Sequence, residues 1–123
     1  MTSVVGEIGI NASGNVETAC ALASMLKEAG CDYAKLQCRD IDWCYSPEDL
    51  AKPCESPWGT TIEAKVRGRE LSWEQIDTFN AHCRQIDLPW FASCFDLSAL
   101  KRLHARYPTR PYKKVPSVLG TRR

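Results

Sequence analysis

Four short segments rich in apolar residues alternate with amphipathic segments along this chain, and this alternation restricts its fold more than any other feature. The short segments cover residues 3–10, 31–38, 88–95 and 111–117. Strands that alternate with helices pair in parallel through right-handed crossover connections. Parallel strands are covered on both faces, so they read as almost continuous apolar runs. The sequence therefore predicts an α/β fold of about four parallel β/α units.

Helix-capping residues mark where the amphipathic segments begin and end. Asn15 can cap a helix that ends near Gly30, and Ser72 with Gln75 forms a capping box for a second helix. Asp96 can cap a third helix, which should end before Pro108. Between residues 39 and 71 the sequence predicts only one helical turn, at 46–52, and a proline- and glycine-rich loop at 52–61.

Two architectures satisfy this pattern: a small open sheet, or part of a β/α barrel. A complete barrel needs about 250 residues. The chain has 123 residues, about half of that number. We expect a partial, half TIM-type β/α barrel, with the open sheet as the alternative.

Composition excludes several functional classes. The residues are 44% hydrophobic and 25% charged, with a formal net charge of +1, which favours a globular protein over a nucleic-acid or membrane-surface binder. We find no apolar run of membrane-spanning length and no signal-like start, and expect a cytoplasmic location. Seven cysteines without a C-x-x-C pair indicate free thiols packed as small core residues.

Charged and polar side chains interrupt the predicted strands near their ends. A buried carboxylate without a partner is costly, so Glu7 in the middle of "VGEIGIN" needs an explanation. Ligands of β/α folds bind at the carboxyl ends of the strands. We interpret the set as a site, although each residue could instead be satisfied locally: Glu7, Asn11, Lys35, Gln37, Ser93, Asp96, Lys114 and Ser117.

Lysines and a serine at strand ends are suited to binding an anion, most plausibly a phosphate. A carboxylate opposite them is suited to proton transfer, metal support or positioning of water. Amide and hydroxyl groups nearby could bind a polar, sugar-like partner. The residues alone therefore predict a phosphate-bearing reactant beside a polar one.

Five motifs in order resemble the N-terminal half of the sialic acid (N-acetylneuraminate) synthase family. They are "EIGINASGN", "AKLQ", "PWGTT", "WFASCFD" and "YKKVPS". The resemblance extends from about Val4 to Ser117 and implies that residues 1–123 form the N-terminal part of the family's β/α barrel domain, without its C-terminal antifreeze-like domain.

The resemblance implies a condensation of phosphoenolpyruvate with N-acetylmannosamine or a related sugar, which releases phosphate. A divalent metal, manganese or magnesium, polarises the sugar aldehyde in the family. Matched residue by residue, Glu7 is the catalytic carboxylate. The phosphoenolpyruvate ligands are Lys35, Lys114 and Ser117, and the sugar contacts are Gln37, Ser93 and Phe95.

The chain also departs from the family pattern. Ala12 replaces the family's first-strand histidine, and "VLGTRR" replaces a carboxylate expected after Ser117. His82 and His104 match neither of the family's metal-binding histidines, so no metal ligand is expected in this chain. We therefore expect a truncated synthase-like protein that is inactive alone and either self-associates or requires a complementing half. The alternative is a non-catalytic anion-binding or vestigial α/β protein.

Overall fold

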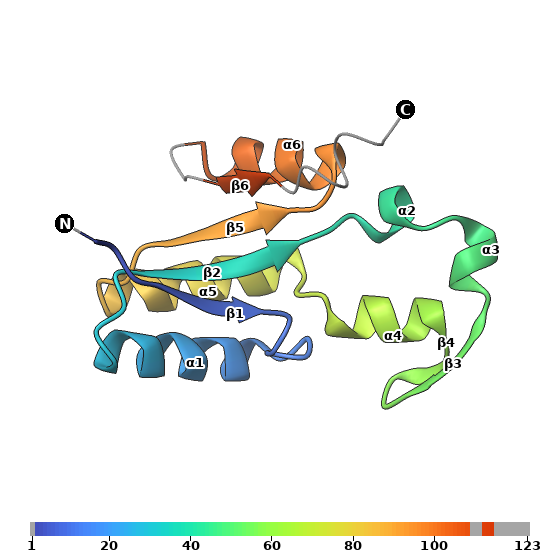
Figure 1. The fold of residues 1–123 in the computed structure, drawn as a ribbon, viewed down its shortest axis with the longest axis horizontal. Helices are drawn as coiled ribbons and strands as arrows, with labels where there is room; N and C mark the ends of the chain where they lie inside the picture. Colours follow the sequence, from blue (N-terminus) through green and yellow to red (C-terminus); the bar gives the residue numbers. More distant parts are fainter. Residues whose placement is uncertain (1, 109–111, 115–123) are drawn as a thin grey trace.

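Four strands pair in parallel to form the central sheet of the computed structural model, which describes residues 2–108 and 112–114. The order in the sheet, β1-β2-β5-β6, follows the chain, and every neighbouring pair is parallel (Figure 1). The strands are β1 (Val5–Gly9), β2 (Tyr33–Cys38), β5 (Trp90–Cys94) and β6 (Tyr112–Lys114). The predicted α/β class with parallel strands is confirmed.

Three helices connect these strands, and the predicted capping residues begin each of them. They are α1 (Val16–Glu28), α5 (Trp73–Gln85) and α6 (Leu97–Arg106). Asn15 accepts a hydrogen bond from the Thr18 amide at 3.0 Å, and Ser72 forms the capping box that the sequence predicted. Asp96 accepts from the Ala99 amide at 2.7 Å. Local capping signals therefore fixed the helix starts correctly.

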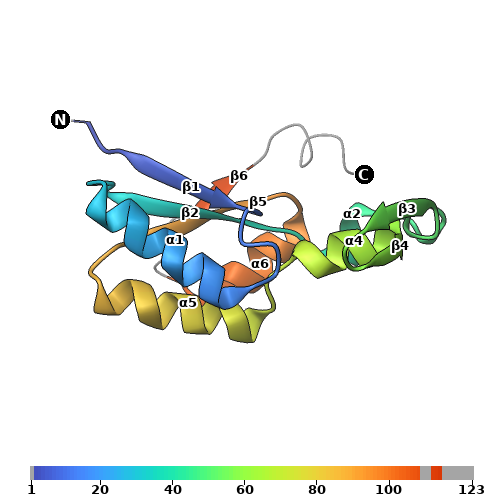
Figure 2. The ribbon, with the colours of Figure 1, turned by 90° about the horizontal axis from the view of Figure 1, so that it is seen from below.

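All three helices lie on the same side of the sheet (Figure 2). Their apolar sides and the alternate residues of the strands form one core, in which Trp90 is 1% exposed. The Trp90 ring packs edge-on between Phe79 and Tyr107, with ring centroids 5.7 and 5.4 Å away. Sequential strand order with helices on one face is how a β/α barrel arranges successive units, whereas a doubly wound sheet carries helices on both faces.

The segment between β2 and α5 corrects the prediction of a loop with one helical turn. It contains α2 (Ile41–Cys44), α3 (Pro47–Leu50), an antiparallel hairpin of β3 (Pro53–Ser56) and β4 (Gly59–Thr61), and α4 (Ile62–Arg69). These elements extend beyond the carboxyl end of β2 (Figure 1). A separate apolar cluster of Ile41, Leu50 and Val66 supports them. The elements are too short for periodicity to reveal them.

The seven cysteines are all free thiols in the structure, as the sequence predicted. The predicted core position holds for Cys38, Cys83 and Cys94, which are buried, but not for the other four, which are only partly buried: Cys20, Cys31, Cys44 and Cys54. Burial raises the pKa of the Cys94 thiol to about 11. Among the described residues, we find no helix with the length and apolar character needed to cross a bilayer.

Candidate functional site

The sheet face opposite the helices carries half of the predicted set of eight residues: Glu7, Lys35, Gln37 and Ser93. Along β1 and β2 the buried residues alternate with half-buried or exposed ones, so one set faces the core and the other faces away from it. No helix of the described residues covers this second face (Figure 2), which we call the open face. Its residues are Val5, Glu7, Tyr33, Lys35, Gln37, Phe91 and Ser93.

The open face has an apolar part and a polar part. Toward the amino ends of the strands, Tyr33 and Phe91 pack edge-on with ring centroids 5.9 Å apart, and Val5 is in register with Tyr33. Toward the carboxyl ends lie Glu7, Lys35 and further polar groups. The side chains that could do chemistry therefore lie nearer than the aromatic pair to the carboxyl ends of the strands, where β/α folds bind ligands.

Glu7, Lys35 and Ser93 form a continuous chain of contacts across three neighbouring strands. The Lys35 ammonium lies 2.8 Å from Glu7 Oε1 and donates a hydrogen bond to Ser93 Oγ at 2.5 Å. The Lys35 side chain is 13% exposed and that of Glu7 is 45% exposed. A nearly buried ammonium needs such partners, because an unpaired charge in this position would be costly.

A β-bulge at Gly9 shapes the carboxyl end of β1 beside Glu7. The register shifts between Glu7, which pairs with Lys35, and Gly9, which pairs with Leu36. Gly9 has a φ of +57°, and a Cβ atom there would lie 3.5 Å from Glu7 Oε1 and 3.6 Å from Gln37 Nε2. Glu7 and Gln37 thus flank the same small space. Sequence reasoning missed Gly9, although a glycine inside a strand pattern is a signal for a bulge.

Phe95 and Arg39 extend the site beyond the last residues of β5 and β2. The Arg39 guanidinium carbon lies 5.5 Å from the Phe95 ring centroid, and Arg39 Nε donates to Glu70 at 3.1 Å. Burial raises the pKa of the Glu70 carboxyl, and the facing Arg39 opposes that effect. Phe95 was predicted as a site residue, whereas sequence reasoning missed Arg39 and Glu70. Arg39 directly follows a predicted strand and could have been found, whereas Glu70 carries no local signal.

Asp96 serves the fold and not the site, which corrects its place in the predicted set. Its carboxylate is fully buried and accepts hydrogen bonds from the Asp40 amide at 2.8 Å and the Cys44 thiol at 3.2 Å, besides capping α6. Asp40 in turn accepts from Ser98 Oγ at 2.5 Å, a bond that lowers the pKa of Asp40. This network ties the segment after β2 to the start of α6.

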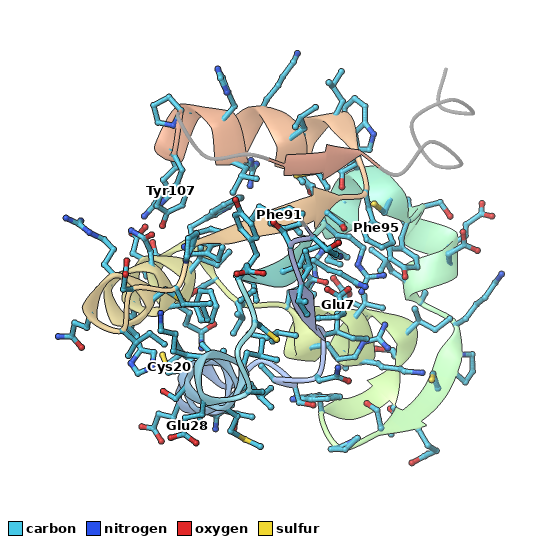
Figure 3. The ribbon with its side chains drawn as sticks, turned by 60° about the vertical axis from the view of Figure 1, so that its left-hand side comes forward. Glu7, Cys20, Glu28, Phe91, Phe95 and Tyr107 are labelled. Atoms are coloured by element: carbon cyan, nitrogen blue, oxygen red, sulfur yellow. The ribbon has the colours of Figure 1, made fainter. Side chains whose placement is uncertain are left out.

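The remaining predicted residues differ in how the structure describes them. Asn11 is exposed in the turn after β1, where its backbone amide donates to the Ile8 carbonyl at 2.9 Å. Lys114 lies in β6, with Cys94 as its Cα partner on β5, so its backbone is at the carboxyl end of the neighbouring strand. Ser117 lies outside the described residues. His82 bonds Ser24 Oγ at 2.8 Å between α5 and α1, and His104 is exposed. Figure 3 labels Glu7, Phe91 and Phe95 among the side chains around the sheet.

A cavity of about 500 Å³ is lined in part by the residues that directly follow β2. Each of the three arginines that line it is paired with an acidic side chain. The pairs are Arg39 with Glu70, Arg67 with Asp42, and Arg102 with Asp40. Because these charges are matched within the protein, this cavity is a weaker candidate for an anion site than the open face.

Comparison with known proteins finds a matching family and individual relatives. The sequence profile of the NeuB family matches residues 22–121. The chain is 29% identical over 103 residues to N-acetylneuraminate-9-phosphate synthase of Mus musculus, covering 82% of this chain and 29% of that protein. It is 31% identical over 104 residues to the synthase of the same name from Drosophila melanogaster, covering 83% and 28%.

Solved structures agree with the sequence matches. The spore coat polysaccharide biosynthesis protein spsE of Bacillus subtilis superposes with a TM-score of 0.65 at 26% identity, over 91% of this chain and 28% of that one. A putative spore coat polysaccharide biosynthesis protein E of Chromobacterium violaceum gives 0.67 at 21% identity, over 85% and 31%, which supports the fold alone. The chain spans less than a third of the length of these relatives. The resemblance that the motifs predicted is confirmed.

Proposed function

Because the chain belongs to the NeuB family, we propose that its open face contains part of a sialic acid synthase-like site that binds phosphoenolpyruvate. The observation that carries the proposal is the chain of contacts from Glu7 through Lys35 to Ser93. It supplies a nearly buried cation, a hydroxyl and a carboxylate on three neighbouring parallel strands, in the middle of β1 and β2 and near the carboxyl end of β5. Such groups are suited to anchoring a phosphate-bearing substrate and handling a proton beside it.

The family resemblance implies a role for each residue, and we propose these roles here. Lys35 would neutralise the anion. Glu7, the more exposed partner, would hold a proton or a water molecule next to the reacting carbons. Gln37 and Phe95 would contact the sugar, together with Ser93. Lys114 would complete the phosphoenolpyruvate site from the neighbouring strand β6, an assignment that is supported by its backbone register alone. The family resemblance assigns Ser117 to the same site, and this residue lies outside the described residues.

The reaction we propose is that of the family: condensation of phosphoenolpyruvate with N-acetylmannosamine or a related sugar. The family's divalent metal is not supported by the residues in hand. Among residues 2–108 and 112–114, no group of three histidine, cysteine or acidic side chains could hold an ion.

We further propose that residues 1–123 act as the N-terminal part of a β/α barrel and do not turn over substrate alone. In the part of the chain that the structure describes, the sheet is open, so these residues enclose the anion site from one side only and water would screen its charges. A second copy of the chain or a complementing half would cover the open face. The free thiols support a reducing, cytoplasmic location.

A non-catalytic role is the second candidate, and Ala12 favours it. Ala12 is 3% exposed and packs in the core, at the position where the family pattern has a histidine. A vestigial protein would retain anion binding at Lys35 without turnover.

Two measurements test the proposal. Calorimetric titration with phosphoenolpyruvate should show saturable binding that Lys35→Met abolishes and Lys101→Met, an exposed lysine on α6, preserves. Equal binding by both variants would contradict the proposed site.

A phosphate-release assay with phosphoenolpyruvate, N-acetylmannosamine and manganese should show no turnover by the isolated chain. Turnover abolished by Glu7→Ala would overturn the expected inactivity and the vestigial alternative.

A further inference from the structure

The cation that would bind the substrate anion is already engaged on two sides. Lys35 Nζ lies 2.8 Å from the Glu7 carboxylate and 2.5 Å from the Ser93 hydroxyl. While the carboxylate remains there, the pair is neutral and a second anion gains little from Lys35. An anion that binds at full strength must therefore replace one of the two partners.

Glu7 is the partner that can leave. It is on β1, an edge strand of the described sheet, and its side chain is 45% exposed. Its carboxylate can turn toward water because nearly half of the side chain is exposed, and the incoming anion then takes its place beside the nearly buried ammonium, which is not left without a partner. Ser93 is 4% exposed on a strand paired on both sides. Its neutral hydroxyl does not repel an anion, so nothing requires it to move.

The structure also provides a place for the released carboxylate. Gly9 has no side chain, and the position of its missing Cβ is in ordinary contact distance of both Glu7 Oε1 and Gln37 Nε2. The Gln37 amide offers two N–H donors. The bulge at Gly9 gives the edge strand a local bend beside Glu7. A short rotation of the Glu7 side chain would exchange an ammonium partner for an amide partner.

We propose that Glu7 is an exchangeable counter-ion, which holds Lys35 in the unliganded protein and is displaced toward Gly9 and Gln37 when a phosphate-bearing anion binds Lys35. The inference rests on the proposed function, since it concerns the same site. It adds an order of events. Anion binding frees the carboxylate, so Glu7 becomes available to handle a proton only when the anion is in place.

Variants of Glu7 distinguish exchange from simple repulsion. Glu7→Gln removes the charge. Glu7→Asp keeps the charge on the same strand but shortens the side chain, so the carboxylate should no longer reach Lys35. If contact is what competes with the anion, both variants should bind more tightly. If only the nearby charge matters, Glu7→Asp should bind like the unaltered protein. Glu28→Gln is the matched control, because Glu28 is exposed on α1 away from Glu7 (Figure 3).

The experiment is calorimetric titration of the full chain and these variants with phosphoenolpyruvate, after circular dichroism has shown equal folding. We expect Glu7→Gln and Glu7→Asp to bind about five-fold more tightly, which corresponds to about 1 kcal/mol. Glu28→Gln should leave the affinity unchanged.

Other outcomes separate the two proposals. Loss of binding in Lys35→Met with no gain in either Glu7 variant would overturn the exchange and leave the anion site standing. A gain in Glu7→Gln alone, or an equal gain in Glu28→Gln, would also overturn the exchange. Unaltered binding by Lys35→Met, or no binding by any protein, would overturn the anion site and the exchange together.

Discussion

Gly14 and Gly68 cross so closely that a Cβ atom on Gly14 would lie 2.0 Å from the carbonyl oxygen of Gly68. Trp58 covers the other side of the crossing, since a Cβ on Gly68 would lie 2.2 Å from its indole ring. The loop after β1, the end of α4 and the β3–β4 hairpin therefore meet at one point. Gln75 Nε2 donates to the Gly14 carbonyl at 3.0 Å and adds α5 to the contact.

Gly14→Ala should lower the free energy of unfolding by about 3 kcal/mol, because it combines overpacking with a left-handed residue. The φ of Gly14 is +75°. Gly30→Ala is the control, since Gly30 has a φ of +89° but no atom within 4 Å of its missing Cβ. It should cost only about 1 kcal/mol. Urea denaturation measures both, and equal losses would show that the crossing adds nothing.

Acid should weaken the junction of α5 and α6. Hydrogen bonds from Arg106 and then Tyr107 lower the pKa of Asp77 to about 2. An unfolded aspartate has a pKa of about 3.9, so this contribution is complete above that pH and is lost as the pH falls toward 2. Both partners of the ion pair are exposed, so we expect a small effect. Melting temperatures of the protein and of Asp77→Asn should converge in acid, and a constant difference would contradict the assignment.

The thiols should fall into two classes of reactivity. Burial and then the Asp96 carboxylate raise the pKa of Cys44 to about 12, and burial raises that of Cys94 to about 11. Both remain protonated near pH 8, and the protonated thiol is a poor nucleophile. Titration with a disulfide reagent should modify Cys31 and Cys54 before Cys44 and Cys94, and should find all seven after denaturation. Early modification of Cys94 in the folded protein would refute this order.

Short-range sequence signals predicted only those features of the fold that depend on neighbouring residues. Asn15, Ser72 and Asp96 mark helix starts by their own side chains, so the three long helices were found from sequence. The contact between Lys35 and Ser93 depends on the register of β2 and β5, which no local pattern encodes. The β3–β4 hairpin was missed because strands of four and three residues resemble a proline-rich loop. Glu70 reaches Arg39 only through the path of α4.

We expect copies of the isolated chain to associate through the open face. Tyr33 and Phe91 form an aromatic pair there, and Val5 beside them is 44% exposed. Parallel sheets are rarely left uncovered on one face, and unpaired edge strands add to the tendency to associate. Light scattering should therefore show dimers or larger species, and Tyr33→Gln with Phe91→Gln should shift them toward the monomer. Met25→Gln is the control, since Met25 is 63% exposed on α1. A monodisperse monomer that binds no hydrophobic dye would contradict the expectation, because the apolar part of the open face would then be tolerated in water.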